Sequence, residues 1–372
     1  MLVKEYKKDK DYIATTISSR QVVKPSLKLV IDNEPTNKPL NVFSINNRRY
    51  LGNKYKLNKF IKKIISEECG DFESFADLFA GAVASIFQDR HLIVNDILYS
   101  NYVCYQTWFG TEHYSQSKIQ NYIQKYNTLI IKKDNYWSKN YGNTYFSKEN
   151  CRKIGFIRED IEQNYSVNNL NNREKCILIT SLLYAMDKIA NTCGHYDAYR
   201  KNGELDKDLV LGMPLIQKTN PRNEIYNTDI NQLAKFVSAD VVYLDPPYNS
   251  RQYCDAYHLL ENIARWEKPD VYGVAKKMDR TALKSDYCTI SATKAFEDLI
   301  KNIQAKYIIL SYNNMANKGN DRSNAKLSDD DIMRILKSKG KVKIFSQDYK
   351  AFSTGKSNIE ENAERLFVCQ CF

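Results

Sequence analysis

The sequence lacks several features that would place it in common protein classes. No stretch of about 18 apolar residues occurs in its 372 residues, which argues against a membrane span. The nine Cys residues form an odd number without a CxxC pair, and the four His residues share no close spacing. These patterns argue against a disulfide framework and structural zinc, and they favour reduced thiols. The basic N-terminus also lacks the apolar stretch of a signal peptide, so we expect a cytoplasmic protein.

Two common nucleotide-binding motifs are also absent. Neither a GxGxxG run nor a loop of the form GxxxxGKS or GxxxxGKT occurs, which disfavours NAD and ATP as ligands. Hydrophobic residues nevertheless make up 43% of the chain and aromatic residues 12%, which is too much for a wholly disordered protein. The length favours one large α/β domain that carries a substantial insertion.

Positive charge is concentrated near the N-terminus. The formal net charge is +11, and residues 1–60 alone hold 13 basic and 5 acidic residues. Residues 101–224 add 17 basic and 13 acidic side chains, together with 17 of the 45 aromatic residues. This mixture suits a nucleic-acid partner, because phosphates attract basic side chains and bases stack on aromatic ones. A solvated basic tail beside ordinary core aromatics would have the same composition, so charge alone leaves both interpretations open.

The hydrophobic pattern divides the chain into a basic arm, an α/β core and an insertion. Residues 1–44 contain three Pro and show no sustained periodicity, so they predict an arm to which we assign no fold. Residues 101–224 are rich in Asn and Tyr, with a clear helical pattern only at 176–190, and we interpret them as an inserted domain. The flanking regions, 45–100 and 225–372, alternate strands and helices. The predicted strands are 75–79, 91–94, 240–244, 307–310, 341–346 and 365–371, and the predicted helices are 57–65, 82–87, 292–303 and 328–337.

The motif Asp245-Pro246-Pro247-Tyr248 follows directly on the predicted strand 240–244. In open α/β sheets ligands bind beyond the carboxyl ends of strands, and two prolines there restrict the backbone and remove two N–H donors. The expected result is a stiff corner whose carbonyls and carboxylate could accept an amino group and whose Tyr ring could face a planar base. A Pro-rich turn without a function is the alternative interpretation of so short a motif.

A second candidate site follows the predicted strand 75–79. This strand carries Asp77 and leads through Phe79 and Ala80 to Gly81, where glycine would let the backbone approach a ligand. Asp96 ends the next strand about 20 residues further on, the distance at which nucleoside-binding folds place a carboxylate for ribose hydroxyls. Strand-Gly-helix turns are common in any α/β fold, but the two features together indicate a nucleoside-bearing cofactor.

Four segments in this order resemble the D12 class of adenine-specific DNA methyltransferases. They are YLGNK (50–54), DLFAGAVAS (77–85), VVYLDPPYNSRQY (241–253) and ILSYNN (309–314). The resemblance covers roughly residues 45–372, and its order is similar to that of the family's α group. Two longer stretches, 191–201 and 245–266, look more like the adenine methyltransferases that accompany type IIS restriction enzymes, which modify short asymmetric sites.

The resemblance implies a fold, an activity and partners. The fold would be a Rossmann-like S-adenosylmethionine-dependent methyltransferase core with a mixed seven-stranded sheet and an inserted, largely helical target-recognition domain at 101–224. The activity would be methyl transfer from S-adenosylmethionine to the N6 amine of a flipped adenine in double-stranded DNA, without a metal. A cognate restriction endonuclease acting on the same site is the implied partner. An asymmetric site would suit a monomer.

The resemblance also implies roles for particular residues. Asp245 would accept a hydrogen bond from the adenine N6, the carbonyl of Pro246 would accept another, and Tyr248 would stack on the base, with Pro247 completing the motif. These acceptors would localise the nitrogen lone pair and stabilise the positive charge that develops on it. A Ser in place of Asp245 is the family's usual cytosine-N4 version, so Asp245 favours adenine. The implied cofactor residues are Tyr50, Lys54, Asp77, Phe79, Ala80, Gly81, Asp96 and Asp245.

A further set of residues would contact DNA. Extruding the base costs a few kcal/mol, which phosphate contacts and stacking must offset. The predicted contact residues are Arg48, Arg49, Asn249, Arg251, Tyr253, His195, Tyr196, Arg200 and Lys201, with Asp197 and Tyr199 on the same surface. A surface hydrogen bond is the alternative role for each of them. We expect Tyr257 and His258 to be packing residues and Cys254 to be incidental.

Two other functions remain open from the sequence. An RNA adenine methyltransferase could use the same pocket. A DNA-binding module without cofactor affinity is the second alternative, because Val83 stands where the family usually has a second glycine and could narrow the cofactor pocket. The intact DPPY motif argues against this second alternative.

Overall fold

The computed structural model describes residues 39–48, 50–79, 81–313, 325–348 and 363–372. The chain divides into two units, Met1–Glu34 and Pro35–Phe372, and all described residues belong to the second. The predicted N-terminal arm therefore lies outside the described residues, apart from residues 39–44. Within the described part of the chain, no helix has the length and apolar character needed to cross a membrane.

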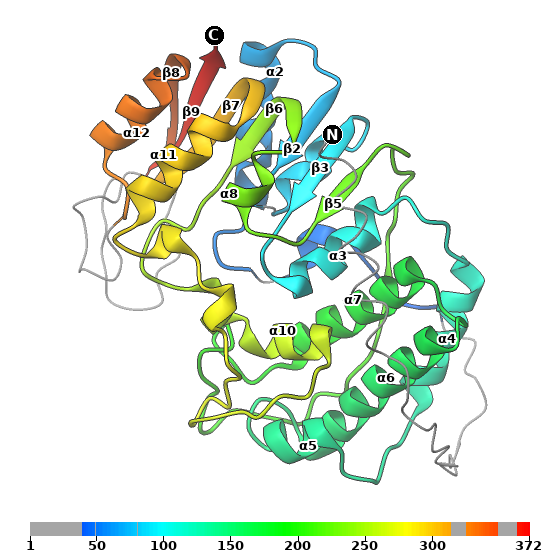
Figure 1. The fold of residues 1–372 in the computed structure, drawn as a ribbon. Helices are drawn as coiled ribbons and strands as arrows, with labels where there is room; N and C mark the ends of the chain where they lie inside the picture. Colours follow the sequence, from blue (N-terminus) through cyan, green and yellow to red (C-terminus); the bar gives the residue numbers. More distant parts are fainter. Residues whose placement is uncertain (1–38, 49, 80, 314–324, 349–362) are drawn as a thin grey trace, which may run out of the picture. The chain divides into compact units, whose positions relative to one another are not determined.

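A seven-stranded mixed sheet forms the centre of this unit (Figure 1), with the strand order β5-β3-β2-β6-β7-β9-β8. The first five strands are parallel, and β9 is antiparallel to both β7 and β8. The strands are β2 (Ser74–Asp77), β3 (His91–Asn95), β5 (Glu224–Tyr226), β6 (Ser238–Leu244), β7 (Gln304–Asn313), β8 (Gly340–Asp348) and β9 (Ala363–Cys371). A separate pair joins β1 (Val42–Phe43) to β4 (Met213–Pro214) in parallel.

Helices cover both faces of the sheet, because alternate residues of the strands are apolar on opposite sides. On one face Phe75 and Val241 share a hydrophobic core with α2. On the other face Ala76 and Val242 pack with α8, α11 and α12, and Figure 1 shows α8 and α11 in front of the strands. These helices are α2 (Asn58–Cys69), α8 (Ile230–Leu233), α11 (Ala292–Asn302) and α12 (Asp329–Lys337).

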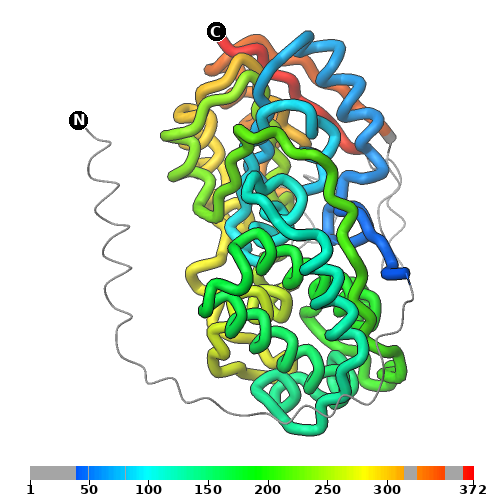
Figure 2. Tube along the Cα trace, turned by 90° about the vertical axis from the view of Figure 1, so that its right-hand side faces the viewer, coloured from blue at the N-terminus to red at the C-terminus, as the bar shows by residue number. Residues whose placement is uncertain are grey.

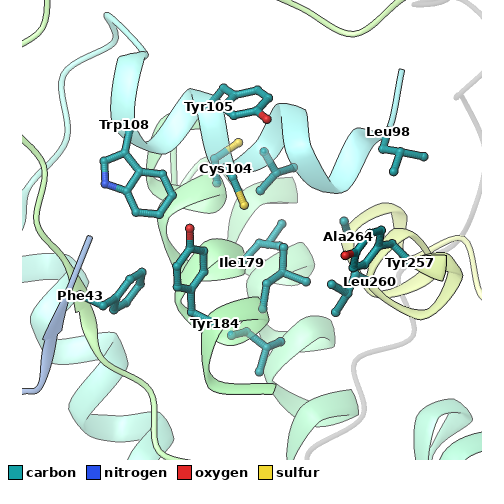
Figure 3. Close-up of a cluster of buried hydrophobic side chains, with 14 of the residues drawn as sticks. Phe43, Leu98, Cys104, Tyr105, Trp108, Ile179, Tyr184, Tyr257, Leu260 and Ala264 are labelled. Carbon is teal, nitrogen blue, oxygen red and sulfur yellow. The ribbon is translucent and has the colours of Figure 1, made fainter. Parts of the chain in front are cut away.

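A helical region lies between β3 and β5 in the sequence. Its members are α3 (Tyr99–Phe109), α4 (Gln116–Thr128), α5 (Tyr136–Tyr141), α6 (Lys148–Ser166) and α7 (Asn172–Ile189), and α9 (Tyr253–Ala256) and α10 (His258–Arg265) follow β6. Figure 3 shows α3, α7 and α10 meeting around Cys104, Ile179 and Leu260. Figure 2 shows α4 to α7 gathered away from the strands. The helical region shares one core with a face of the sheet, while its assignment as a target-recognition domain stays a prediction.

Short 3-10 helices occupy several connections, namely η1 (Ile45–Asn47), η2 (Tyr55–Leu57), η3 (Val83–Phe87), η4 (Thr281–Leu283) and η5 (Asp286–Cys288). The helix predicted at 82–87 is thus a 3-10 segment, and the N–H of Ser85 bonds the carbonyl of Ala82. The strand predicted at 75–79 already ends at Asp77, because its side chain binds the backbone of the next turn.

The sequence reading correctly predicts the mixed α/β sheet but wrongly finds only one clear helix in residues 101–224. Five α-helices begin within or just before this region. Helix α3 was missed because eight of its eleven residues, Tyr and Asn positions included, are buried, so it has no polar face. A helix that is buried on most sides lacks the amphipathic period that predicts a helix.

Candidate active site

A cavity of about 610 Å³ lies at the carboxyl ends of the parallel strands. The chain leaves β2 towards β3 on one side and β6 continues towards β7 on the other, so the strand order reverses between β2 and β6. Such a switch point is where open α/β sheets bind ligands, and the volume falls in the range of small-molecule sites. Its wall includes Lys54, Phe79, Asp96, Asp245 and Tyr287.

The corner after β6 contributes directly to this cavity. Asp245 and Pro247 line it, Pro246 is buried, and Tyr248 is half-buried beside it. The backbone carbonyl of Tyr248 accepts hydrogen bonds from the Tyr312 hydroxyl at 3.2 Å and from the N–H of Lys326 at 2.7 Å. The corner is therefore held from β7 as well as by its own prolines.

A buried polar cluster surrounds Asp245. The Tyr248 hydroxyl lies 2.9 Å from Asp245 Oδ1 and 2.8 Å from Glu364 Oε1. Lys54 Nζ lies 2.7 Å from Glu364 Oε1 and 3.4 Å from Asp245 Oδ1, and it also contacts the Tyr248 hydroxyl. Ser311 donates to Glu364 Oε1 at 2.8 Å. Two carboxylates thus share one ammonium group and one phenol at the cavity wall.

The electrostatics of this cluster keep its members in defined protonation states. Burial raises the pKa of Asp245 to about 6, with Lys54 lowering it and Glu364 raising it. Burial alone would lower the pKa of Lys54, but the two carboxylates outweigh burial and raise this pKa above its ordinary value. At neutral pH Asp245 is therefore mostly an ionised acceptor and Lys54 a cation.

Asp77 organises the turn after β2 instead of facing the cavity. Its carboxylate is fully buried, and Oδ2 accepts the N–H groups of Gly81 at 3.4 Å and Ala84 at 3.1 Å. Burial raises its pKa to about 7, although these two backbone bonds lower it. In the structure Asp77 positions the cavity-lining Gly81 through Oδ2, and its implied contact with the cofactor stays a prediction.

Asp96 faces the cavity with a fixed carboxylate. Oδ1 accepts the N–H of Leu98 at 2.7 Å, and Oδ2 accepts the amide of Asn101 at 2.9 Å. Burial raises the pKa of Asp96 to about 7, and the two hydrogen bonds lower it. Phe79 lies in the same cavity wall and packs edge-on against Tyr287, with 4.9 Å between ring centroids.

The segment 50–54 closes another side of the cavity. Tyr50 stacks on Tyr257 with 4.5 Å between ring centroids and an interplanar angle of 10°. The Tyr257 hydroxyl accepts the N–H of Leu51 at 2.6 Å. Gly52 has φ +74°, and an added Cβ would lie 3.0 Å from the Tyr253 hydroxyl, so glycine is needed at this position. The expected packing role of Tyr257 is thus to hold the YLGNK turn in place.

Two residues predicted to contact DNA lie in the interior. Arg48 is 8% exposed, pairs with Asp187 at 3.3 Å and donates to Asn101 at 2.9 Å. Tyr196 is 2% exposed, and its hydroxyl donates to Asp187 at 2.6 Å. Both predictions of a surface contact are corrected, because neither side chain reaches the outer surface of the protein. Arg48 instead lines the cavity, and Tyr196 lies in the interior against Asp187.

The other predicted DNA contacts are more accessible. Arg251, Arg200 and Lys201 are exposed, and Asn249, Tyr253 and His195 are half-buried. Gln252, next to Arg251, bonds the backbone of Ser285 in both directions, at 3.0 and 2.8 Å. Arg251 thus directly precedes a residue of the cavity wall. The predicted residues Arg49 and Ala80 lie outside the described residues.

Other predicted roles concern packing and pocket size. His258 is fully buried with its Nε2 2.9 Å from the Tyr196 carbonyl, as expected for a packing residue. Cys254 is buried and lines the cavity wall. Val83 also lines the cavity, and the volume of about 610 Å³ is that of the cavity with the Val83 side chain in its wall.

Several site residues were not anticipated from the sequence. Glu364 is the clearest case: it lies just before the predicted strand 365–371, and a lone acidic residue at a strand end is an ordinary pattern. Asn101 orients Asp96 from α3, which was itself not predicted. The cavity also extends along Thr228 and Asp229 after β5, a strand too short and polar to be recognised.

Comparisons with known proteins agree with this geometry. The family model for D12 class N6 adenine-specific DNA methyltransferases matches residues 50–321. The chain is 36% identical over 341 residues to the modification methylase StsI of Streptococcus sanguinis, covering 85% of this chain and 50% of that protein. It is 32% identical over 334 residues to the type II methyltransferase M.NlaIII of Neisseria lactamica, covering 86% and 96%. Identity to the type II methyltransferase M.FokI of Planomicrobium okeanokoites is 30% over 350 residues, covering 87% and 52%. The chain thus spans about half the length of two of these relatives and nearly all of the third.

Proposed function

This chain belongs to the D12 class of N6 adenine-specific DNA methyltransferases, and on that premise we propose that it methylates the N6 amine of an adenine flipped out of a specific duplex DNA site. One observation carries the proposal. The Asp245 carboxylate stands at the end of β6 in the same cavity as Asp96 and Lys54, so an amine acceptor and a nucleoside-binding carboxylate share one space.

The residues of the cavity fit S-adenosylmethionine as the methyl donor. When bound, this cofactor supplies an electrophilic methyl group on a sulfonium centre. Asp96 presents a carboxylate already oriented by Leu98 and Asn101, which suits the two hydroxyls of a ribose. Phe79 and Tyr287 offer aromatic faces and edges for a purine in the same cavity. Gly81 leaves its backbone open to the ligand, because a Cβ added there would meet no atom within 4 Å.

Asp245 would act on the target base as a hydrogen-bond acceptor. The lone pair of an adenine amine is delocalised into the ring, and acceptors for both N6 hydrogens favour a pyramidal, nucleophilic nitrogen. Asp245 and the carbonyl of Pro246 are placed on consecutive residues of a stiff corner, so neither needs to reorganise during reaction. Asp245 also stabilises the positive charge that develops on the nitrogen. The proton leaves to solvent or to Asp245 after the methyl group has been transferred.

Duplex DNA would contact the exposed cations Arg251, Arg200 and Lys201, which could reach phosphates or bases. The extruded base would enter beside the Tyr248 ring. The similarity to methylases of type II systems supports a protective role beside a restriction endonuclease at a short site. A monomer would suffice for an asymmetric site.

Methyl incorporation tests the proposal. Purified protein is incubated with tritiated S-adenosylmethionine and either duplex DNA or structured RNA, and the labelled nucleosides are separated. We expect label in DNA as N6-methyladenine. Label in RNA alone, or on cytosine, would contradict the proposal. Methylation-sensitive sequencing of DNA from cells that express the protein then identifies the site.

A further inference from the structure

The Tyr248 hydroxyl has one proton and two carboxylate acceptors. It lies 2.9 Å from Asp245 Oδ1 and 2.8 Å from Glu364 Oε1. A phenol donates only one hydrogen bond, so at any moment it serves either Asp245 or Glu364. Because the two distances are nearly equal, the hydroxyl can switch between the two acceptors without movement of the surrounding side chains.

The target amine needs the Asp245 carboxylate, one oxygen of which already has protein partners. In the structure Asp245 Oδ1 is approached by both the Tyr248 hydroxyl and, at 3.4 Å, Lys54 Nζ. An acceptor that already receives a hydrogen bond and faces a cation is a weaker partner for an incoming N–H group. At Oδ1 the arriving adenine therefore competes with two groups of the protein itself.

Glu364 is placed to accept hydrogen bonds from both the Tyr248 hydroxyl and the Lys54 ammonium group. Only 5% of it is exposed, and β9 holds it opposite Asn313 of β7 in the antiparallel register. Its Oε1 receives Lys54 Nζ at 2.7 Å and Ser311 Oγ at 2.8 Å as well as the phenol. Lys54 is thus already closer to Glu364 than to Asp245.

We propose that Glu364 is a positioning residue for methyl transfer, which draws the Tyr248 hydroxyl and the Lys54 ammonium away from Asp245 when the target amine docks. Asp245 then keeps free lone pairs for the N6 hydrogens, and the phenol and the ammonium group both stay hydrogen-bonded. This inference rests on the proposed function, because only an amine substrate needs those lone pairs.

The protonation states of the donors agree with this role. Burial raises the pKa of the Tyr248 phenol well above its ordinary value, and Asp245 and Glu364 raise it further. The net effect of burial and the two carboxylates on Lys54 is also a raised pKa. Both groups remain donors at neutral pH and must therefore be placed on some acceptor.

The first test is the variant Glu364→Gln, which keeps the shape and one acceptor oxygen but removes the charge. We expect kcat to fall about 10- to 100-fold, the range typical when a partner that orients a reactive group is lost. KM for DNA and for cofactor should stay near the wild-type values. Adding Tyr248→Phe to Glu364→Gln should raise kcat above that of the single variant, because the competing hydroxyl is gone. The matched control is Asp240→Asn, which alters a paired carboxylate at the opposite end of β6 and should leave kcat unchanged.

A second readout does not depend on turnover. The carboxyl ¹³C resonance of Asp245 is titrated in wild type and in Glu364→Gln. Asp245 is faced by Lys54, by Glu364 of β9, by Tyr248 and Tyr243 of its own segment, and by Asp77 of β2. Removing the Glu364 charge should lower the Asp245 pKa, because repulsion ends and Lys54 turns to its remaining partner.

The outcomes separate the two proposals. A lowered Asp245 pKa with a lower kcat and rescue by Tyr248→Phe supports the role of Glu364. An unchanged Asp245 titration, or a double variant no faster than Glu364→Gln alone, overturns it. If the wild type transfers no methyl group while the Asp245 pKa still falls in Glu364→Gln, the proposed function fails and the shared hydrogen bonding by Glu364 stands.

Discussion

Replacing Lys54 with Met should shift the pH dependence of methyl transfer upward. Asp245 must be ionised to accept the target amine, and its pKa of about 6 predicts that kcat/KM rises with pH to about 6 and then levels off. Lys54 Nζ lies 3.4 Å from Asp245 Oδ1 and stabilises the ionised form. Without this cation, the pKa of Asp245 and the midpoint of the profile move to higher pH.

The size of the shift follows from the distance. At 3.4 Å and an effective dielectric constant of about 20, two unit charges interact by roughly 5 kcal/mol, and one pKa unit corresponds to about 1.4 kcal/mol. Lys54 also divides its charge with Glu364 at 2.7 Å, and the Asp245 side chain keeps 19% of its surface exposed. Both facts reduce the full Coulomb value, so we expect a shift of roughly 1 to 3 units.

The assay is a pH series of initial rates at saturating cofactor, because Lys54 also lines the cavity. The matched control is Lys306→Met, which removes the cation 2.7 Å from Asp240 at the other end of the same strand. We expect the control profile to coincide with that of wild type. A midpoint that stays in place or moves to lower pH in Lys54→Met would refute the assignment of Asp245 as the titrating acceptor.

Three further predictions concern neighbouring residues. Asp96→Asn should weaken cofactor binding about 10- to 100-fold in calorimetric titration, since hydrogen bonds to a charged group contribute roughly 1.5–3 kcal/mol. Unchanged affinity would show that Asp96 does not bind the cofactor. Asp77→Asn should raise the free energy of unfolding by up to about 4 kcal/mol at pH 8 and by little at pH 4. The reason is that Asp77 has a pKa of about 7 in the folded protein, so the cost of ionising it is absent at low pH and grows as the pH rises. Denaturant titrations at both pH values measure this, and equal changes at pH 4 and pH 8 would contradict it. Arg48→Ala should destabilise the fold by about 3–5 kcal/mol, because it removes the buried cation that pairs with Asp187. Arg251→Ala should leave the melting temperature unchanged and reduce the salt dependence of DNA binding by about one unit of slope. A stable Arg48→Ala variant with a reduced salt slope would restore Arg48 as a DNA contact.

The sequence predicts the site best where a chemically suited side chain lies at the end of a predicted strand. Asp245 and Asp96 each follow directly on a buried parallel strand, and parallel strands bring their carboxyl ends to one edge, so both residues reach the same cavity. Asp77 is the last residue of its strand, and its side chain turns to the amides of the following turn. The strand bounds that separate these two cases come from the structure, because the sequence predicted that the strand of Asp77 continues to residue 79.

Other features depend on tertiary contacts that no local pattern contains. Arg48 lies in a basic segment typical of a phosphate contact, but it is drawn inside by Asp187, which is more than 130 residues away in the chain. Glu364 reaches Lys54 across a sequence separation of 310 residues. Helix α3 is buried on most sides, which hides its period. Each of these features depends on tertiary packing and could therefore be identified only in the three-dimensional structure.

The most direct test of the account is single-turnover methyl transfer by Asp245→Ala at a duplex whose target adenine is known, with DNA affinity measured on the same preparation. We expect N6-methyladenine formation to be lost while the protein still binds the duplex, because the carboxylate acts on the reacting amine and not on the phosphates. Substantial methyl transfer by this variant, with the duplex bound as in wild type, would contradict the claim that the corner after β6 activates the adenine.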